Sequence, residues 1–204
     1  MHFCGADGSG EMVKTENFEQ VEVASKGELR GWLAKNHTQK ESIWLVTYKK
    51  QVPEKYVSVQ EVLDELLCFG WIDGIRRKLD EDQRTMQLIS PRKVEHWTKT
   101  YKERYAKLEK LGLVESAGKE SVVKAKVARL WDFMDDVDAL IKPSDFAAAL
   151  AGFAHATANF DAFGASSQRF VLRWIKIAKT PETRAKRIQQ AAELADRNEK
   201  IPGL

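Results

Sequence analysis

The sequence predicts an α+β fold, in which a small antiparallel sheet and early helices are covered by a C-terminal all-helical layer. Segments with strand character occur in the first half of the chain, whereas the second half contains only helix-forming segments. With 204 residues, the chain can build one good hydrophobic core. We therefore expect a disordered leader at 1–17 and a single domain at 18–204, with a sheet-containing half at 18–94 and a helical half at 95–204.

Two strands and a helix are predicted before residue 50. Phe18–Ala24 alternates apolar and polar residues, which is typical of a weak strand. Ser25-Lys26-Gly27-Glu28 is a capping box that opens a helix ending at about His37. Ser42–Tyr48 is rich in β-branched and aromatic residues and predicts a strand.

A second helix and a hairpin follow. Ser58-Val59-Gln60-Glu61 is another capping box, and the helix that it starts ends at Gly70. Strands are predicted at about Trp71–Leu79 and Thr85–Ile89, joined by a charged turn at Asp80–Gln83.

The rest of the chain is predicted to be helical. Pro143-Ser144-Asp145 caps one of these helices, and Thr180-Pro181 gives the last one an N-cap and a favoured first-turn proline. The helices are expected at about Glu95–Leu111, Glu120–Leu130, Phe146–Ala154, Ser167–Ala178 and Glu182–Arg197.

The charge is unevenly distributed. The chain has a net charge of +3, which is too small to indicate a nucleic-acid-binding protein, so nucleic acid is an unlikely partner. Residues 166–204 contain nine basic and four acidic residues, a net charge of +5. This basic segment indicates either an anionic partner or a solvated helix surface.

The two cysteines, Cys4 and Cys68, indicate neither a disulfide nor a metal site. Cys4 lies in the expected leader, and Cys68 lies on an apolar helix face, where we expect a core residue. The histidines have no ligand-like spacing, so no metal and no cofactor are expected. No apolar run reaches the roughly 20 residues of a membrane span, and no secretory signal is evident, so we expect a cytoplasmic protein.

The most informative stretch is Leu67–Gly74, in which one carboxylate lies within an apolar run. Gly70 can take the left-handed conformation that ends a helix, and Gly74 can do something similar at a bend. Asp73 either accepts backbone hydrogen bonds in a structural turn or lies in a binding cleft.

Arg92 and a set of four tryptophans each have both a structural and a functional interpretation. Arg92 follows Pro91 at a strand exit and forms either a salt bridge to Asp73 or Asp64, or a clamp for a carboxylate or phosphate. Four tryptophans either fill the core or line a pocket: Trp44, Trp71, Trp97 and Trp174.

A basic group is expected at the start of the last helix. Lys179 precedes the cap, and Arg184 and Arg187 lie three residues apart on one face. A helix N-terminus with neighbouring arginines suits an anion. The alternative is a solvated face with intramolecular ion pairs.

The sequence resembles the YdeI/OmpD-associated family, also called the bacteriocin-protection family, over about Phe18–Arg197. The resemblance is most specific in the Phe69–Gly74 run and in the threonine-arginine-x-x-arginine-isoleucine tail at Thr183–Ile188. Further matching stretches are Ile43–Lys50, Leu63–Glu65, Ser90–Arg92, Trp97, Ala117-Gly118, Ala125-Lys126, Trp174-Ile175 and Ala178-Lys179.

The resemblance implies an association with bacteriocin and cationic-peptide tolerance in bacteria, but no established reaction. The chain departs from the family pattern after Arg92. The usual serine and asparagine flanking the tryptophan are Glu95 and Tyr101 here, and Thr98 replaces a serine. Any ligand contact that those polar groups make in relatives is therefore in doubt for this chain.

We expect a stress-associated protein that binds a small anionic ligand or a protein partner and has no established reaction, so that whether it is an enzyme stays open, with a non-catalytic role favoured. The expected ligand-binding residues are Trp71, Asp73, Arg92, Trp97, Lys179, Arg184 and Arg187. One alternative is a hydrolase or transferase acting on a phosphorylated or acyl substrate, with Asp73 as base and Arg92 as anion stabiliser. Another is a weak nucleic-acid-binding protein that uses the basic C-terminal helices.

Overall fold

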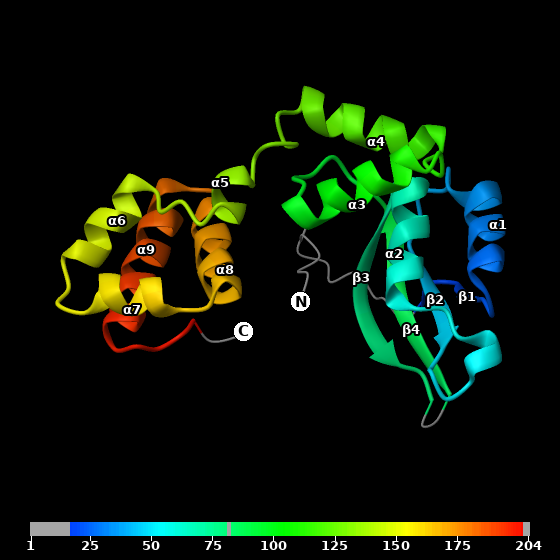
Figure 1. Ribbon diagram of the computed structural model, residues 1–204, viewed down its shortest axis with the longest axis horizontal. Coiled ribbons are helices and arrows are strands. Elements are labelled where there is room, and N and C mark those ends of the chain that lie inside the picture. The colour runs from blue at the N-terminus through cyan, green and yellow to red at the C-terminus, as the bar shows by residue number, and fades with distance from the viewer. Residues whose placement is uncertain (1–16, 81–82, 202–204) are drawn as a thin grey trace. The chain divides into compact units, whose positions relative to one another are not determined.

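A computed structural model describes residues 17–80 and 83–201, so nearly all of the expected leader lies outside the described residues. The chain divides into two compact units (Figure 1). Unit 1 comprises the residues up to Glu95 together with Thr100–Trp131, and unit 2 comprises His96–Lys99 and the residues from Asp132 onward. The prediction of α+β is confirmed. All four strands lie before residue 95 and the later elements are helices, although α3 and α4 belong to the sheet-containing unit. A single domain over 18–204 stays a prediction.

The sheet of unit 1 has four strands in the order β1-β2-β4-β3 and is mixed, not antiparallel as expected. Strand β1 (Gln20–Glu22) runs parallel to β2 (Ile43–Tyr48). Helix α1 (Lys26–Asn36) connects them and returns the chain to the end of the sheet where β1 began. Two parallel neighbours need such a crossover, and the helix supplies it.

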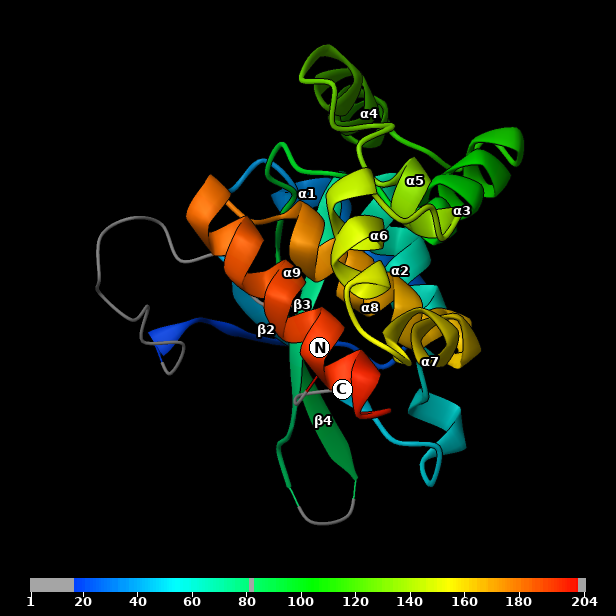
Figure 2. The same ribbon diagram turned by 90° about the vertical axis from the view of Figure 1, so that its left-hand side faces the viewer.

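Strands β3 (Trp71–Lys78) and β4 (Arg84–Pro91) form the predicted hairpin, and Figure 2 shows them side by side. The register shifts between Asp73 and Arg76, which marks an irregularity at Gly74. A Cβ atom at Gly74 would lie 3.2 Å from the backbone oxygen of Leu88. Gly74 therefore serves a close backbone approach within the sheet, and its φ is not positive.

Helix α2 (Val59–Cys68) begins with the predicted capping box, after the short 3₁₀ helix η2 (Pro53–Lys55). Gly70 ends α2 with φ of +70°, as the sequence indicates. Helices α3 (Lys99–Lys110) and α4 (Ser116–Val127) follow the hairpin.

Helix α4 begins four residues before its predicted start. The prediction began too late because Gly118, a poor helix former, lies in this first turn. A Cβ atom at Gly118 would lie 2.5 Å from the backbone oxygen of Cys68 and 2.7 Å from that of Leu67. Only glycine lets the first turn of α4 lie this close to the end of α2.

Unit 2 is helical and has a core of its own. Its longest helix, α9 (Pro181–Asp196), contacts α6, α7 and α8 and shares with them a core that includes Phe146, Phe160 and Ile175. Two of its helices, α5 and α7, are short and were not predicted. The helices that precede α9 are α5 (Asp135–Asp138), α6 (Ser144–Ala151), α7 (Ala156–Ala162) and α8 (Ala165–Lys176).

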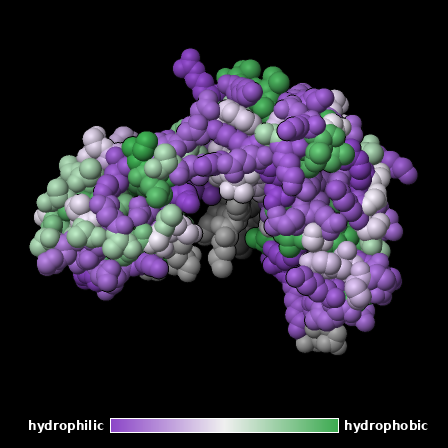
Figure 3. Space-filling model, in the orientation of Figure 1, coloured by the Kyte–Doolittle hydropathy of each residue, from purple (hydrophilic) through white to green (hydrophobic). Residues whose placement is uncertain are grey.

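The surface in Figure 3 is largely hydrophilic, with hydrophobic residues over α4 and in patches on unit 2. Val123 and Val127 of this helix are 58% and 80% exposed. Scattered apolar side chains are normal on protein surfaces. No helix of the described residues is both long enough and apolar enough to cross a membrane.

Candidate functional site

Asp73 belongs to a network of side chains in unit 1. The hydroxyl of Tyr101 donates a hydrogen bond to Asp73 Oδ1 over 2.5 Å, and Gln87 Nε2 donates to Oδ2 over 3.4 Å. Arg76 in turn donates to Gln87 Oε1 over 3.0 Å. The hydrogen bonds of Asp73 therefore come from side chains and not from the backbone of its own turn.

Arg92 is packed into the same network. Its side chain is 3% exposed, and Nη2 lies 3.5 Å from Glu95 Oε1. The guanidinium lies over the Tyr101 ring, 5.1 Å from its centroid. Burial lowers the pKa of Arg92, and burial together with the Asp73 hydrogen bond raises the pKa of Tyr101 well above its usual value.

The two residues that depart from the family pattern, Glu95 and Tyr101, are thus the ones that contact Arg92. The other acid considered as a partner of Arg92, Asp64, pairs with Arg104 at 2.5 Å. The side chain of Arg92 is accordingly held inside the protein and does not present its guanidinium to solvent.

The candidate tryptophans have core positions. Trp71 and Trp97 are each 1% exposed, and the indole of Trp71 donates to the backbone oxygen of His37 over 3.0 Å. Trp44 is equally buried, whereas Trp174 packs against the core of unit 2. Core packing, the structural interpretation of these side chains, is confirmed for the three buried ones.

Arg184 and Arg187 join helices of unit 2. Arg184 makes a bidentate contact with Asp145, with Nε at 2.7 Å and Nη2 at 3.0 Å from the carboxylate oxygens. Arg187 Nη1 donates to the backbone oxygen of Trp174 over 2.5 Å, and its guanidinium lies over that indole. Both arginines therefore form contacts between helices. The hydrogen bonds from Arg184 lower the pKa of the Asp145 carboxyl.

The start of α9 is closed by its own cap, since Thr180 Oγ1 accepts from the backbone N–H of Thr183. Lys179 is exposed and forms no ion pair with a described residue. A cavity of about 210 Å³ in unit 2 is lined in part by Lys176 and Arg184. Lys176 pairs with Asp136 at 2.5 Å, so the cations of this cavity are already neutralised.

The predicted ligand-binding residues are divided between the units. Trp71, Asp73 and Arg92 belong to unit 1, whereas Trp97, Lys179, Arg184 and Arg187 belong to unit 2. Within unit 1, the network of Asp73 and Arg92 is part of neither of the two cavities described here. That these seven residues bind a ligand stays a prediction.

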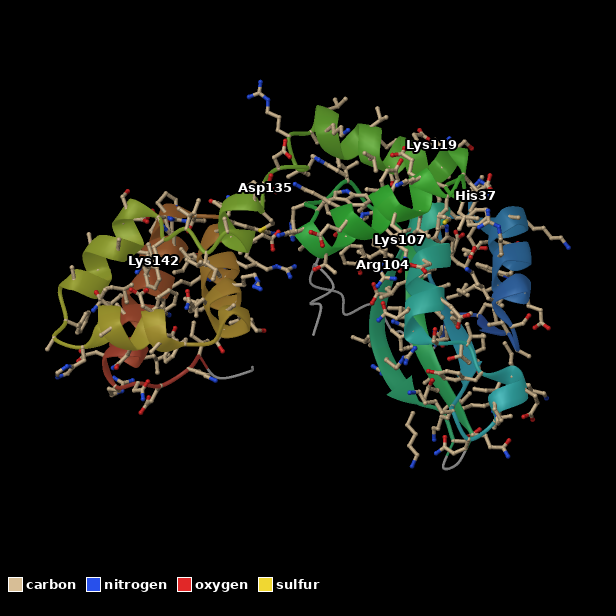
Figure 4. All side chains as sticks on the ribbon, viewed as in Figure 1. His37, Arg104, Lys107, Lys119, Asp135 and Lys142 are labelled. Carbon is tan, nitrogen blue, oxygen red and sulfur yellow. The ribbon has the colours of Figure 1, made fainter. Side chains whose placement is uncertain are left out.

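A larger cavity lies elsewhere in unit 1, at residues that the sequence did not indicate. This cleft has a volume of about 440 Å³. One side is helix α1, which contributes Gly27, Arg30, Gly31 and Ala34. His37, labelled in Figure 4, caps α1 and lines the same cleft. The volume falls in the range of about 300–1,000 Å³ that is usual for ligand sites.

The opposite side comes from the ends of two other helices. It includes Phe69, the C-cap of α2, together with Glu115 and Ser116 at the start of α4. The side chain of Glu115 does not cap α4, in contrast to Ser25, Ser58 and Thr180 at their helices. The positive end of the α4 dipole therefore opens beside the cleft.

Arg30 is the cation of this cleft, and other residues hold it in place. Its Nη1 donates to Glu65 Oε2 over 2.9 Å, and its Nη2 donates to the backbone oxygen of Leu113 over 3.1 Å and to Glu115 Oε1 over 2.7 Å. The guanidinium also lies 5.2 Å from the centroid of the Phe69 ring. The Arg30 side chain keeps 32% of its surface exposed, so a ligand can reach it.

The carboxylates around Arg30 have different environments. Glu65 is 1% exposed and is also 3.4 Å from Lys26, whereas Glu115 is 50% exposed. Breaking the buried pair would leave a charge in the protein interior, but an exposed ion pair contributes only about 0–1 kcal/mol. Glu65 therefore fixes Arg30, and Glu115 is the partner that another anion can replace.

Beneath the cleft, Cys68 is fully buried. Burial, reinforced by the charge of Glu65, raises the pKa of its thiol to about 11. A thiol with this pKa is not a thiolate near neutral pH, so it is a poor nucleophile. The prediction that Cys68 is a core residue is confirmed.

The part of the chain that the structure describes contains no cluster of three or more His, Cys, Asp or Glu side chains that could hold a metal ion. Sequence reasoning missed Arg30 because its partners Glu65 and Glu115 lie 35 and 85 positions away. The available signal was the pair of glycines that flank Arg30 inside a predicted helix, Gly27 and Gly31.

Two family models match different parts of the chain. Residues 139–198 match the model described as "Bacteriocin-protection, YdeI or OmpD-Associated", and residues 21–121 match a domain of unknown function, DUF8412. The resemblance is thereby confirmed for the C-terminal part, which contains Thr183–Ile188. The Phe69–Gly74 run lies within the other match. No curated protein and no solved structure gives a significant match.

Proposed function

We propose that this chain, whose residues 139–198 carry a domain of the bacteriocin-protection, YdeI or OmpD-associated family, is a non-catalytic protein that binds an anionic group beside Arg30. The observation that carries this proposal is the cleft of about 440 Å³ in unit 1, where Arg30 is both held in place and accessible. The cleft lies in the part of the chain that matches DUF8412, so the proposal concerns that domain.

Electrostatics supports an anionic ligand. Lys26 and Arg30 are balanced by Glu65 and Glu115 as long as Glu115 contacts Arg30. When Glu115 turns toward solvent, one positive charge remains beside the N-terminus of α4. Arginine forms charge-assisted hydrogen bonds with carboxylates and phosphates, and a helix N-terminus adds to this attraction.

Calorimetric titration of the purified chain with sodium acetate and sodium phosphate tests the proposal. We expect Glu115→Gln to tighten binding, because it removes the internal competitor. Arg30→Lys should weaken binding about tenfold, since a charge-assisted hydrogen bond is worth about 1.5–3 kcal/mol and 1.4 kcal/mol is tenfold. Lysine also keeps a cation beside Glu65, so this variant avoids an unpaired buried carboxylate.

Arg184→Lys is the matched control. Arg184 is also held by a carboxylate and also lines a cavity, but it lies in unit 2. We expect anion affinity to be unchanged in this variant. An equal loss in both lysine variants, or unchanged binding in Arg30→Lys, would contradict the assignment to Arg30.

For the biological role, we propose a cytoplasmic function in bacteriocin or antimicrobial-peptide tolerance. The family description of residues 139–198 supports it. Deleting the gene in a bacterial host and measuring survival under bacteriocin treatment tests this role. Complementation with the wild-type chain should restore survival, and equal survival with and without the gene would refute the role.

The hydrolase or transferase alternative depends on Asp73 and Arg92. Tyr101 and Gln87 occupy the carboxylate oxygens of Asp73, and the Arg92 side chain is only 3% exposed. This geometry gives less support to catalysis than the Arg30 cleft gives to binding. The nucleic-acid alternative predicts an affinity that falls steeply with salt, and a flat salt dependence would end it.

A further inference from the structure

The α1 side of the Arg30 cleft has almost no side chains. Gly27, Gly31 and Ala34 follow one another at helical spacing and are all exposed. A Cβ atom at Gly31 would meet no atom within 4 Å, and one at Gly27 would meet only Ser25 Oγ, at 3.9 Å. Neither glycine has a positive φ. The packing of the chain itself therefore gives no reason for glycine at these positions.

Glycine inside a helix is less favourable than alanine by about 1 kcal/mol. The effect of the two glycines is to leave the backbone of α1 open along the cleft, on both sides of Arg30 in the sequence. A ligand can therefore approach the helix more closely than it could if side chains were present. An extended ligand fits this feature better than a single ion does.

The volume supports the same conclusion. Cavities of about 300–1,000 Å³ hold whole ligands with several functional groups. A cleft of about 440 Å³ therefore has room for more than one carboxylate group. A bare acetate or phosphate ion would satisfy Arg30 and leave most of the cleft unfilled.

Arg30 also shows how a carboxylate of a polypeptide fits. The carboxylate of Glu115 contacts Nη2 at 2.7 Å from the exposed side. Arg30 also forms a side-chain hydrogen bond with the buried Cys68. The planar guanidinium can hold a carboxylate through two parallel hydrogen bonds. The Nη2 donor that contacts Glu115 becomes available to a ligand carboxylate when Glu115 leaves.

We infer that the cleft binds an acidic peptide, with a glutamate side chain replacing Glu115 on Arg30 and the peptide backbone lying along Gly27 and Gly31. This inference rests on the proposed function, because it uses the same arginine. It adds the class of ligand and assigns Glu115 the role of an internal competitor.

The test uses two probe peptides, acetyl-Gly-Ala-Glu-Ala-Gly-amide and its glutamine counterpart, with acetate as the small anion. We expect the glutamate peptide to bind at least about tenfold more tightly than either acetate or the glutamine peptide. Glu115→Gln should tighten binding of both the glutamate peptide and acetate. A glutamine peptide that binds equally well would overturn the inference.

Gly31 separates the two proposals. Gly31→Leu places a side chain over α1, so it should weaken binding of the glutamate peptide by a much larger factor than binding of acetate, and so abolish the advantage of the peptide. Gly31→Ala adds one methyl group and is the matched control, with most of the advantage retained. Acetate binding without a peptide advantage in the wild type would overturn the peptide inference alone. If neither the glutamate peptide nor acetate binds, the proposed function is overturned as well.

Discussion

Two glycine-to-alanine substitutions should have opposite effects on stability, and they test the packing that forms the cleft. Gly118 lies in the first turn of α4, and Gly31 lies within α1. At Gly118, a Cβ atom would lie 2.5 Å and 2.7 Å from two backbone oxygens of α2 and 2.8 Å from Val114 Cγ1. At Gly31 it would meet nothing within 4 Å.

The expected magnitudes follow from these distances. Alanine gains about 1 kcal/mol over glycine inside a helix, so Gly31→Ala should stabilise the chain by about that amount. Overpacking typically costs about 1–3 kcal/mol, and the backbone oxygens near Gly118 cannot rotate away, so we take about 3 kcal/mol there. Subtracting the helix gain leaves a loss of about 2 kcal/mol. The two variants should thus differ by about 3 kcal/mol.

Urea unfolding followed by circular dichroism measures both free energies of unfolding under identical conditions. Calorimetric titration with acetate should also show weaker binding in Gly118→Ala, because the displaced first turn of α4 carries Glu115 and Ser116, which line the cleft. A Gly118→Ala variant as stable as Gly31→Ala would refute the close packing of α4 on α2.

Three further predictions concern other parts of the molecule. In a Cys4→Ser variant, the remaining thiol, Cys68, should react with a thiol reagent at pH 8 much more slowly than in urea-unfolded protein, since burial raises its pKa to about 11; equal rates would contradict its burial. Arg184 lowers the pKa of Asp145, so the stabilising effect of this carboxylate is present above about pH 4 and is lost as the pH falls through the lowered value; Asp145→Asn should be less stable than wild type at pH 6 and approach it toward pH 3, and a constant difference in urea unfolding would argue against the pair. Tyr101→Phe should lower the free energy of unfolding by about 1–2 kcal/mol, because Asp73 loses a hydrogen-bond donor in a half-buried site; an unchanged urea midpoint would contradict that contribution.

Local signals in the sequence predicted the starts of several helices well. Ser58 and Glu61 form the predicted capping box, and Thr180 caps α9. The turn at Gly70 likewise has the expected left-handed conformation. These features depend on residues within one turn of each other, so the sequence contains all the information that they need.

Long-range features were not predictable in the same way. The direction of β1 depends on how α1 crosses the sheet, and the early start of α4 depends on the carbonyl groups of α2. A lone Gly118 in the sequence argues against a helix, and only the close approach of another backbone explains it. Sequence-based reasoning fails at such positions because the stabilising contact lies elsewhere in the chain.

The candidate site shows the same limit. Arg92 and Arg184 were proposed as anion-binding residues because of their local context, but carboxylates and aromatic rings within their own units contact them. The only local signal at Arg30 is the pair of flanking glycines, and the role of this arginine depends on the distant Glu65 and Glu115. Which arginine remains accessible is decided by tertiary contacts and not by the neighbouring residues.

The most direct test of the account is an NMR titration of the ¹⁵N-labelled chain with sodium acetate. Binding beside Arg30 predicts that the amide signals of Ser116 and Ala117, at the start of α4, shift with a saturable dependence on acetate. These shifts should be strongly reduced in Arg30→Lys. Saturable shifts confined to residues near Arg92 or Arg184, with none at the start of α4, would contradict the central claim that Arg30 holds the ligand.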